Sequence, residues 1–122
     1  MSLLSNQAIE FRQAYGIQNS LSQRETQRSL IVEEFKEFLE ADHQMALMHP
    51  PDRAACLKEL ADLVYVCAQY AENMDWDLEQ ALRRVHRSNM SKLGEDGKPI
   101  YRKDGKVLKG PNYKPPDLSD LV

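Results

Sequence analysis

The chain has 122 residues, 42% of them hydrophobic, and a formal net charge of -3, which is typical of one soluble globular domain. No stretch approaches the ~20 apolar residues of a membrane span, and the N-terminus lacks the basic start and apolar run of an export signal. Cys56 and Cys67 lie within an apolar helical pattern, so we expect free thiols that pack as small hydrophobes. Free thiols suit the reducing cytoplasm, where we expect the protein.

The charge is unevenly distributed along the chain. Residues 1–82 contain six Lys and Arg against fourteen Asp and Glu, whereas residues 83–114 contain ten against three. A solvated helix face followed by a basic tail could produce this pattern by chance, without any functional site. Charge alone therefore does not decide the function.

Apolar residues at helical spacing predict a first helix that ends at Gly16. The segment from Ser22 to Glu25 matches a capping box and predicts the start of a second helix. This helix should run to about Met48, because Pro50 and Pro51 follow it.

Asp52 is placed to cap a third helix that continues to about Met74. Its apolar residues cover nearly every side, so we expect this helix at the centre of the fold. Asp77 similarly predicts the start of a fourth helix that extends to about Lys92.

After Leu93, glycines and prolines replace the helical periodicity, and Lys103-Asp104-Gly105 favours a tight turn between two short extended segments. The expected fold is all-α, a four-to-five-helix antiparallel bundle with a short C-terminal hairpin or loop tail. We expect residues 1–93 to form a helical domain and residues 94–122 to be a basic Gly/Pro-rich tail of the same domain.

Four acidic residues form two pairs with i, i+3 spacing: Glu34 and Glu37 on the second predicted helix, and Glu59 and Asp62 on the third. Like charges at this spacing repel, but a divalent cation between them reverses the sign of the interaction. The short connection predicts antiparallel helices, so the pairs can face each other. Oxygen ligands without Cys or His favour magnesium or manganese over zinc.

An ordinary solvated face is the alternative explanation for any single acidic pair. Glu59 and Asp62, however, interrupt the apolar stretch of the third helix, where an unpaired carboxylate costs several kcal/mol to bury. A bound metal or ligand accounts for them better than solvation does.

The order Glu34-Phe35-Lys36-Glu37, then Glu59-Leu60-Ala61-Asp62, resembles the ExxE…ExxD signature of the MazG-like all-α nucleotide pyrophosphohydrolases. The resemblance extends from about Phe11 to Lys92, and the following segment is similar to phage and bacterial relatives described as phosphoribosyl-ATP pyrophosphohydrolase-like. It implies a cytoplasmic enzyme that hydrolyses a nucleoside triphosphate to its monophosphate and pyrophosphate. The implied substrate is a deoxynucleotide, and the implied assembly is a homodimer or homotetramer.

The resemblance also implies roles for individual residues. Glu34, Glu37, Glu59 and Asp62 would be the magnesium ligands, and Glu33 would be a catalytic residue that binds a second ion or orients the attacking water.

Four further residues are candidates for substrate contact. Asn89 and Lys92 continue an apolar stripe of the fourth helix, where spacing alone fits a frayed, solvated helix end equally well. The resemblance favours nucleotide contact for both. Tyr65, three residues after Asp62, and Tyr113 in the tail complete the set.

Two other functions compete with this interpretation. A helical interaction module could bind nucleic acid or an acidic partner through residues 83–114, but no known nucleic-acid-binding motif is present, so nucleic acid is not expected. A di-iron carboxylate bundle requires two Glu-x-x-His motifs, and Glu40-Ala41-Asp42-His43 supplies one. Metal-dependent release of pyrophosphate would distinguish the enzyme from the interaction module.

Overall fold

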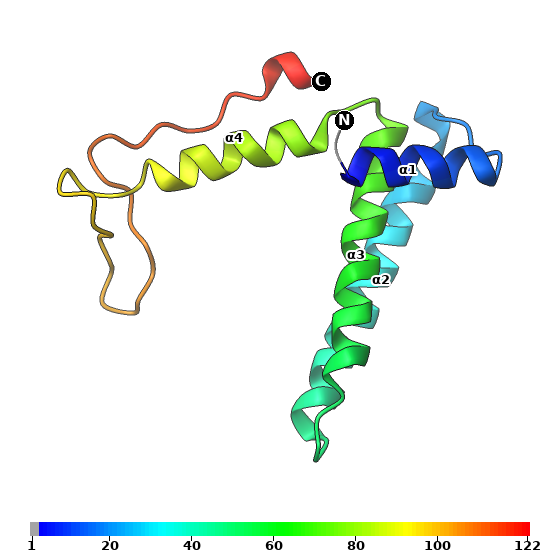
Figure 1. The fold of residues 1–122 in the computed structure, drawn as a ribbon, viewed down its shortest axis with the longest axis horizontal. Helices are drawn as coiled ribbons and strands as arrows, with labels where there is room; N and C mark the ends of the chain where they lie inside the picture. The colour runs from blue at the N-terminus through cyan, green and yellow to red at the C-terminus, as the bar shows by residue number, and fades with distance from the viewer. Residues whose placement is uncertain (1–2) are drawn as a thin grey trace. The chain divides into compact units, whose positions relative to one another are not determined.

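A computed structural model describes residues 3–122, which form four α-helices and contain no β-strand (Figure 1). The helices are α1 (Leu3–Ala14), α2 (Arg24–Leu47), α3 (Arg53–Asn73) and α4 (Leu78–Met90), with the short 3-10 helices η1 (Leu21–Gln23) and η2 (Ser119–Leu121). The predicted all-α class is confirmed. None of the helices in the described range is long and apolar enough to cross a membrane.

The chain divides into two compact units, with the boundary between Trp76 and Asp77. Unit 1 contains α1, α2 and α3, and unit 2 contains α4 and the tail. In unit 1, α2 and α3 lie side by side in opposite directions, and α1 packs on α3 (Figure 1). Unit 1 therefore supplies a long antiparallel helix pair with a third helix across part of it.

Local sequence signals fix most helix boundaries. Gly16 adopts a φ of 64° just after α1, a conformation that glycine tolerates and that ends the helix. The Asp52 carboxylate accepts a hydrogen bond from the Ala55 amide at 3.0 Å, and Asp77 does the same for the Gln80 amide at 3.0 Å. Both predicted N-caps are confirmed.

The capping box predicted at Ser22 is wrong. Ser22 lies inside η1, the residue before α2 is Gln23, and neither the 3-10 nor the α-helical start has a side-chain cap. The Ser22 hydroxyl instead lies 2.9 Å from the hydroxyl of Ser20. The chain thus enters α2 through a 3-10 turn, in which the Ser22 hydroxyl pairs with the Ser20 hydroxyl and does not cap a helix amide.

The expected central position of α3 is confirmed within unit 1, because α3 packs against both α1 and α2. The expectation that little of this helix faces water is wrong for the chain alone. Leu57 is 65% exposed, Leu60 41% and Val64 44%. The buried apolar residues are small: Ala8, Cys56, Ala68 and Ala71. Two neighbouring helices cover only part of the circumference of α3, so a sequence that is apolar all round leaves a large face uncovered.

A buried polar network joins the ends of unit 1. Arg12 on α1 is 3% exposed, and its guanidinium donates to Asn19 Oδ1 at 2.6 Å, Asn73 Oδ1 at 2.9 Å and Gln69 Oε1 at 3.3 Å. Asn73 in turn binds both the amide and the carbonyl of Ser20. The connection between α1 and α2 is therefore held to the C-terminal end of α3.

In unit 2, the predicted turn at Lys103–Gly105 is present, with Gly105 at a φ of 87°. A single antiparallel bridge joins Tyr101 to Val107, so the flanking segments form a bridged turn rather than two strands. The last part of the tail runs along α4: Ser88 donates to the Lys114 carbonyl at 2.7 Å, and Arg84 donates to the Asp117 carbonyl at 3.0 Å. Hydrogen bonds thus hold the last part of the tail against α4.

Candidate active site

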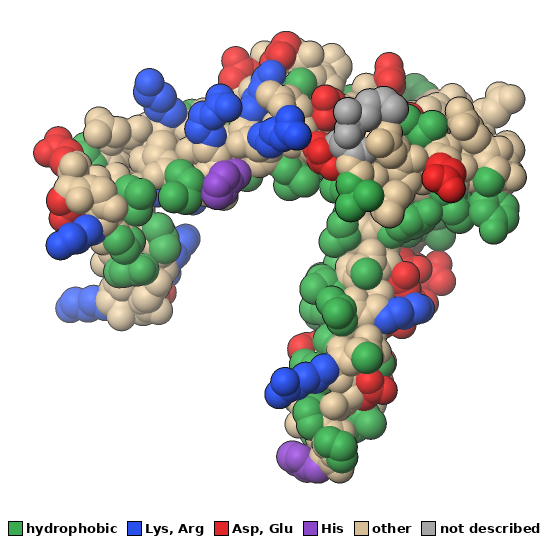
Figure 2. All heavy atoms as spheres, viewed as in Figure 1, with side chains coloured by type: hydrophobic (Ala, Val, Ile, Leu, Met, Phe, Trp, Pro, Cys, Tyr) green, Lys and Arg blue, Asp and Glu red, His purple; other side chains and the backbone are tan. Residues whose placement is uncertain are grey.

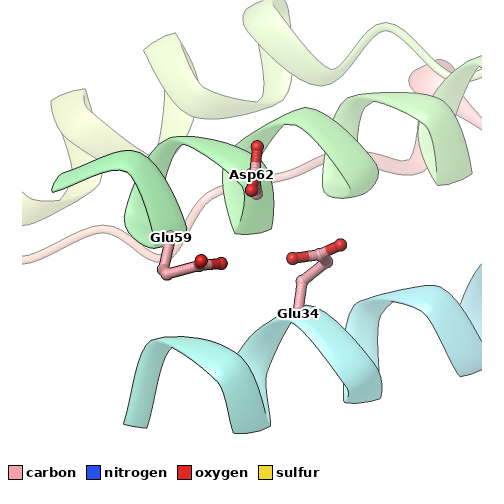
Figure 3. A group of neighbouring side chains, drawn as sticks. All are labelled: Glu34, Glu59 and Asp62. Carbon is pink, nitrogen blue, oxygen red and sulfur yellow. The ribbon is translucent and has the colours of Figure 1, made fainter. Parts of the chain in front are cut away.

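Three of the predicted acidic residues meet between α2 and α3. Glu34 extends from α2, and Glu59 and Asp62 extend from α3 (Figure 3). One carboxylate oxygen from each lies within 4.8 Å of the others. The i, i+3 spacing on α3 and the antiparallel packing of the two helices bring these groups together. We call Glu34, Glu59 and Asp62 the carboxylate cluster.

The carboxylate cluster lacks positive charge at its centre. Within the described residues, Glu34 Oε2 and Glu59 Oε2 are buried without a hydrogen-bond partner. Burial raises the pKa of Glu34 to about 7, and a hydrogen bond with Glu37 and the charges of Glu37, Asp62 and Glu59 act in the same direction. Unsatisfied buried oxygens of this kind are what a hard divalent cation would bind, so the donor set fits magnesium or manganese.

Lys58 provides partial compensation at the edge of the carboxylate cluster. Its ammonium lies 2.7 Å from Asp62 Oδ2 and 3.5 Å from Glu59 Oε1, and these contacts, led by the Asp62 hydrogen bond, raise the pKa of Lys58. The Lys58 side chain is 67% exposed, so the ion pair is solvated and contributes little to stability. The ammonium does not reach the buried oxygen of Glu34 or that of Glu59.

The two remaining predicted acids of α2 lie outside the carboxylate cluster. Glu37 is exposed, but its side chain interacts with that of Glu34 one turn earlier. Glu33 is exposed on α2. His43, from the Glu-x-x-His motif considered above, is likewise exposed and does not belong to the carboxylate cluster. The residues that the structure describes therefore do not form the Glu and His ligand sets that a di-iron bundle requires.

Tyr65 lies one turn beyond Asp62 and is half-buried. Its ring meets that of Phe11 edge-on, with centroids 5.6 Å apart. Both rings line an open pocket of about 340 Å³ between α1 and α3, together with Gln7, Glu10 and Tyr15. The predicted substrate residue thus borders an aromatic pocket on the same helix as two members of the carboxylate cluster.

The other predicted substrate residues lie in unit 2. Asn89 is exposed near the end of α4, and its carbonyl accepts the Lys92 amide at 3.2 Å. The Lys92 carbonyl accepts the Gly110 amide at 2.8 Å, and the Tyr113 amide donates to the Gly110 carbonyl at 3.2 Å. Gly110 therefore connects Lys92 with Tyr113. A side chain at Gly110 would approach the Leu93 carbonyl to 2.3 Å, so this close approach requires glycine.

Two buried glutamines of this region, Gln27 and Gln69, were not predicted as site residues from the sequence. Four buried side-chain atoms without partners in residues 3–122 all lie on α2 and α3: Gln27 Oε1, Glu34 Oε2, Glu59 Oε2 and Gln69 Nε2. Gln27 precedes Glu34 by seven residues, and Gln69 follows Asp62 by seven, which places each two turns along its helix. That spacing was the available signal for Gln27. Arg12 and Gly110 had no such signal, because their partners are distant in sequence.

The fold and the carboxylate cluster define an all-helical protein in which two antiparallel helices carry a shared acidic centre. A family model described as phosphoribosyl-ATP pyrophosphohydrolase matches residues 6–89, which is more than half of the chain. The chain therefore belongs to the phosphoribosyl-ATP pyrophosphohydrolase family. It is a nucleotide pyrophosphohydrolase, a hydrolase that acts on phosphoric anhydrides. No curated protein gives a significant match to the chain.

Proposed function

We propose that this protein is a magnesium-dependent nucleoside triphosphate pyrophosphohydrolase that converts a nucleotide, in particular a deoxynucleoside triphosphate, and water to the monophosphate and pyrophosphate. The observation that carries the proposal is the pair of buried, unpartnered oxygens of Glu34 and Glu59 within the carboxylate cluster. The carboxylates and a polyphosphate are both negatively charged, so the cluster can bind a polyphosphate only when a cation lies between them. Manganese would substitute for magnesium, since both prefer oxygen ligands.

In this proposal Glu34, Glu59 and Asp62 hold the ion, and Glu37, which already interacts with Glu34, completes the ligand set. When bound, the ion would neutralise the charge of the phosphates and lower the pKa of the attacking water. Glu33, exposed on the same helix, orients that water or accepts its proton.

Substrate contacts come from two regions of the chain in this proposal. Tyr65 contacts the nucleoside from the pocket that it lines with Phe11. Asn89, Lys92 and Tyr113 contact the substrate from the junction of α4 with the tail, where Gly110 holds Lys92 and Tyr113 together. We treat the tail, residues 94–122, as part of the same catalytic domain, and we place the enzyme in the cytoplasm because both cysteines are free thiols.

A substrate panel tests the proposal directly. The protein should release pyrophosphate, and not orthophosphate, from one or more nucleoside triphosphates with magnesium or manganese, and a chelator should abolish release. Phosphoribosyl-ATP belongs in the panel, with ribo- and deoxynucleotides of each base. Turnover that continues in excess chelator, or release of orthophosphate alone, would refute the proposal.

The stability of the metal-free protein should depend on pH through Glu34. Because the folded-state pKa of Glu34 is raised from 4.5 to about 7, its contribution is fully present below about pH 4.5 and is lost as the pH rises through about 7. We expect the melting temperature in chelator, compared with that of Glu34→Gln, to fall between pH 5 and 8. Saturating magnesium should remove this fall in melting temperature with pH, because magnesium binds and stabilises the ionised carboxylate. A wild-type curve parallel to that of Glu34→Gln would contradict the assignment.

We further propose that a second copy of the chain covers the exposed apolar face of unit 1. Two stripes form this face: Val32, Phe35 and Leu39 on α2, and Leu57, Leu60 and Val64 on α3. Each stripe has steps of three and four residues and therefore follows one side of its own helix, and the two helices pack against each other. Figure 2 shows apolar side chains along the part of the molecule formed by α2 and α3.

A second helix pair on this face would give a homodimer with a four-helix core, and a pair of dimers would give a tetramer. A second copy of the chain can cover this face, because a twofold axis brings the same apolar patch of the two copies together.

Phe35→Asp tests the assembly. Phe35 is 48% exposed, and a charge at the centre of a buried apolar interface would have to be desolvated. We expect sedimentation to show a larger species for the wild type and a 14.1 kDa monomer for the variant. The matched control is Lys36→Asp, an exposed neighbour outside both stripes, which should leave the mass unchanged. A monomeric wild type at micromolar concentration would overturn the proposal.

A further inference from the structure

A second pocket lies wholly within unit 2, between α4 and the segment 114–117. Its volume is about 280 Å³, and it is lined by Arg84 and Arg87 of α4 and by Lys114, Pro115 and Asp117 of the tail. Figure 2 shows Lys and Arg side chains along the region of α4. The pocket shares no residue with the carboxylate cluster or with the predicted substrate residues.

Hydrogen bonds fix the walls of this pocket without using all of its cations. Ser88 is 5% exposed and donates to the Lys114 carbonyl at 2.7 Å, while the Lys114 amide donates to Ser91 Oγ at 3.0 Å. Arg84 binds the Asp117 carbonyl and forms an ion pair with Asp120. The backbone that carries Lys114 is therefore held against α4 by these hydrogen bonds.

The pocket has an excess of positive charge. Within the described residues, the side chains of Arg87 and Lys114 form no ion pair or hydrogen bond. The negative groups nearby are already occupied: Asp120 pairs with Arg84, and the Asp117 carboxylate accepts the amide and hydroxyl of Ser119 at 3.0 Å and 2.7 Å. Those hydrogen bonds lower the pKa of Asp117, which therefore stays charged and reduces the excess of positive charge, but it forms no ion pair with Arg87 or Lys114. Arg87 and Lys114 remain free to bind an anion.

We propose that this pocket binds a pyrophosphate group through residues that do not belong to the carboxylate cluster. A guanidinium presents a planar set of donors that matches phosphate oxygens, and a lysine adds a compact point charge. Two unpaired cations on opposite walls suit an anion with two linked phosphates better than a single small anion. The ring of Pro115 forms part of the apolar wall of the pocket.

The same pyrophosphate chemistry is available from two sources, free pyrophosphate and the phosphate chain of a nucleoside triphosphate. Calorimetric titration of the full chain in chelator, without divalent metal, avoids both turnover and binding through the metal. We expect inorganic pyrophosphate to bind in the absence of magnesium and sulfate to bind much more weakly. A non-hydrolysable nucleoside triphosphate, titrated in parallel, shows whether the group is accepted when it is attached to a nucleoside.

The decisive variant is Arg87→Gln with Lys114→Gln, and the matched control is Arg83→Gln, whose side chain is 70% exposed on the same helix but does not line the pocket. The double variant should weaken pyrophosphate binding by about tenfold or more, and the control by less than about twofold. Circular dichroism verifies that both variants keep their helices. No binding by the wild type, or equal weakening by the variant and the control, would overturn the proposal. Neither result depends on catalysis, so the outcome is independent of the proposed function.

Discussion

Asp62→Asn should reduce pyrophosphate release by roughly a hundredfold or more, because it removes a charged oxygen ligand from the carboxylate cluster without changing the volume of the side chain. The remaining proposed ligands, Glu34, Glu37 and Glu59, would hold the ion less tightly, so part of the lost activity should return as magnesium is raised. The measurements are initial rates across a magnesium titration, with melting temperature followed alongside. Asp62 pairs with the exposed Lys58, and this solvated ion pair contributes little, so the fold should persist.

Asp42→Asn is the matched control for this experiment. Asp42 is an exposed acid of α2 that does not belong to the carboxylate cluster, so the same chemical change there should leave turnover within about twofold of wild type, as is usual for surface substitutions. Wild-type rates for Asp62→Asn at every magnesium concentration would disprove the metal-site assignment. Equal losses in both variants would indicate a general electrostatic effect instead.

The carboxylate cluster could be predicted because its information is local. The spacing of Glu59 and Asp62 sets their common side of α3, and the short connection at Pro50 and Pro51 sets the direction of α2 relative to α3. The caps at Asp52 and Asp77 follow from the same kind of information, since each side chain binds an amide three residues later. These features depend on a few neighbouring residues, and they could therefore be predicted.

Features that depend on distant parts of the chain were not predicted. The apolar pattern of α3 showed which residues avoid water, but it did not show that α1 and α2 leave Leu57 and Val64 exposed. The sequence around Ser22 also did not show that this residue would lie in a 3-10 turn. The loop that leads into the turn is held by Asn73, 53 residues from Ser20. Long-range partners of this kind have no signature in a single sequence.

Arg12 is the strongest case of such a long-range feature, and replacing it should have the largest effect on stability. Its guanidinium is 3% exposed and donates to neutral acceptors from Gln18, Asn19, Gln69 and Asn73. Desolvation lowers the pKa of Arg12, with the charge of Glu72 acting in the opposite direction, yet an arginine remains protonated under these conditions. The buried cation is thus stabilised chiefly by hydrogen bonds.

Arg12→Met should lower the free energy of unfolding by about 2–4 kcal/mol, because it leaves buried acceptors without donors, while relief of the buried charge offsets part of the loss. Urea unfolding measures this difference. Arg28→Met, at an exposed arginine of α2, is the matched control and should change stability by no more than about 0.5 kcal/mol. Unchanged stability in Arg12→Met would show that the network contributes nothing net.

The loss of Arg12 should also extend to the substrate side of unit 1. Arg12 holds Gln69 on α3, and Phe11, its neighbour on α1, contacts Tyr65. Freeing this end of α1 should therefore loosen the aromatic pocket as well as the loop at residues 17–20. We expect faster amide hydrogen exchange in that loop and a raised Michaelis constant, with magnesium affinity nearly unchanged because the carboxylate cluster does not include Arg12 or any of its hydrogen-bond partners. A loss of magnesium affinity equal to the loss of substrate affinity would contradict this division of roles.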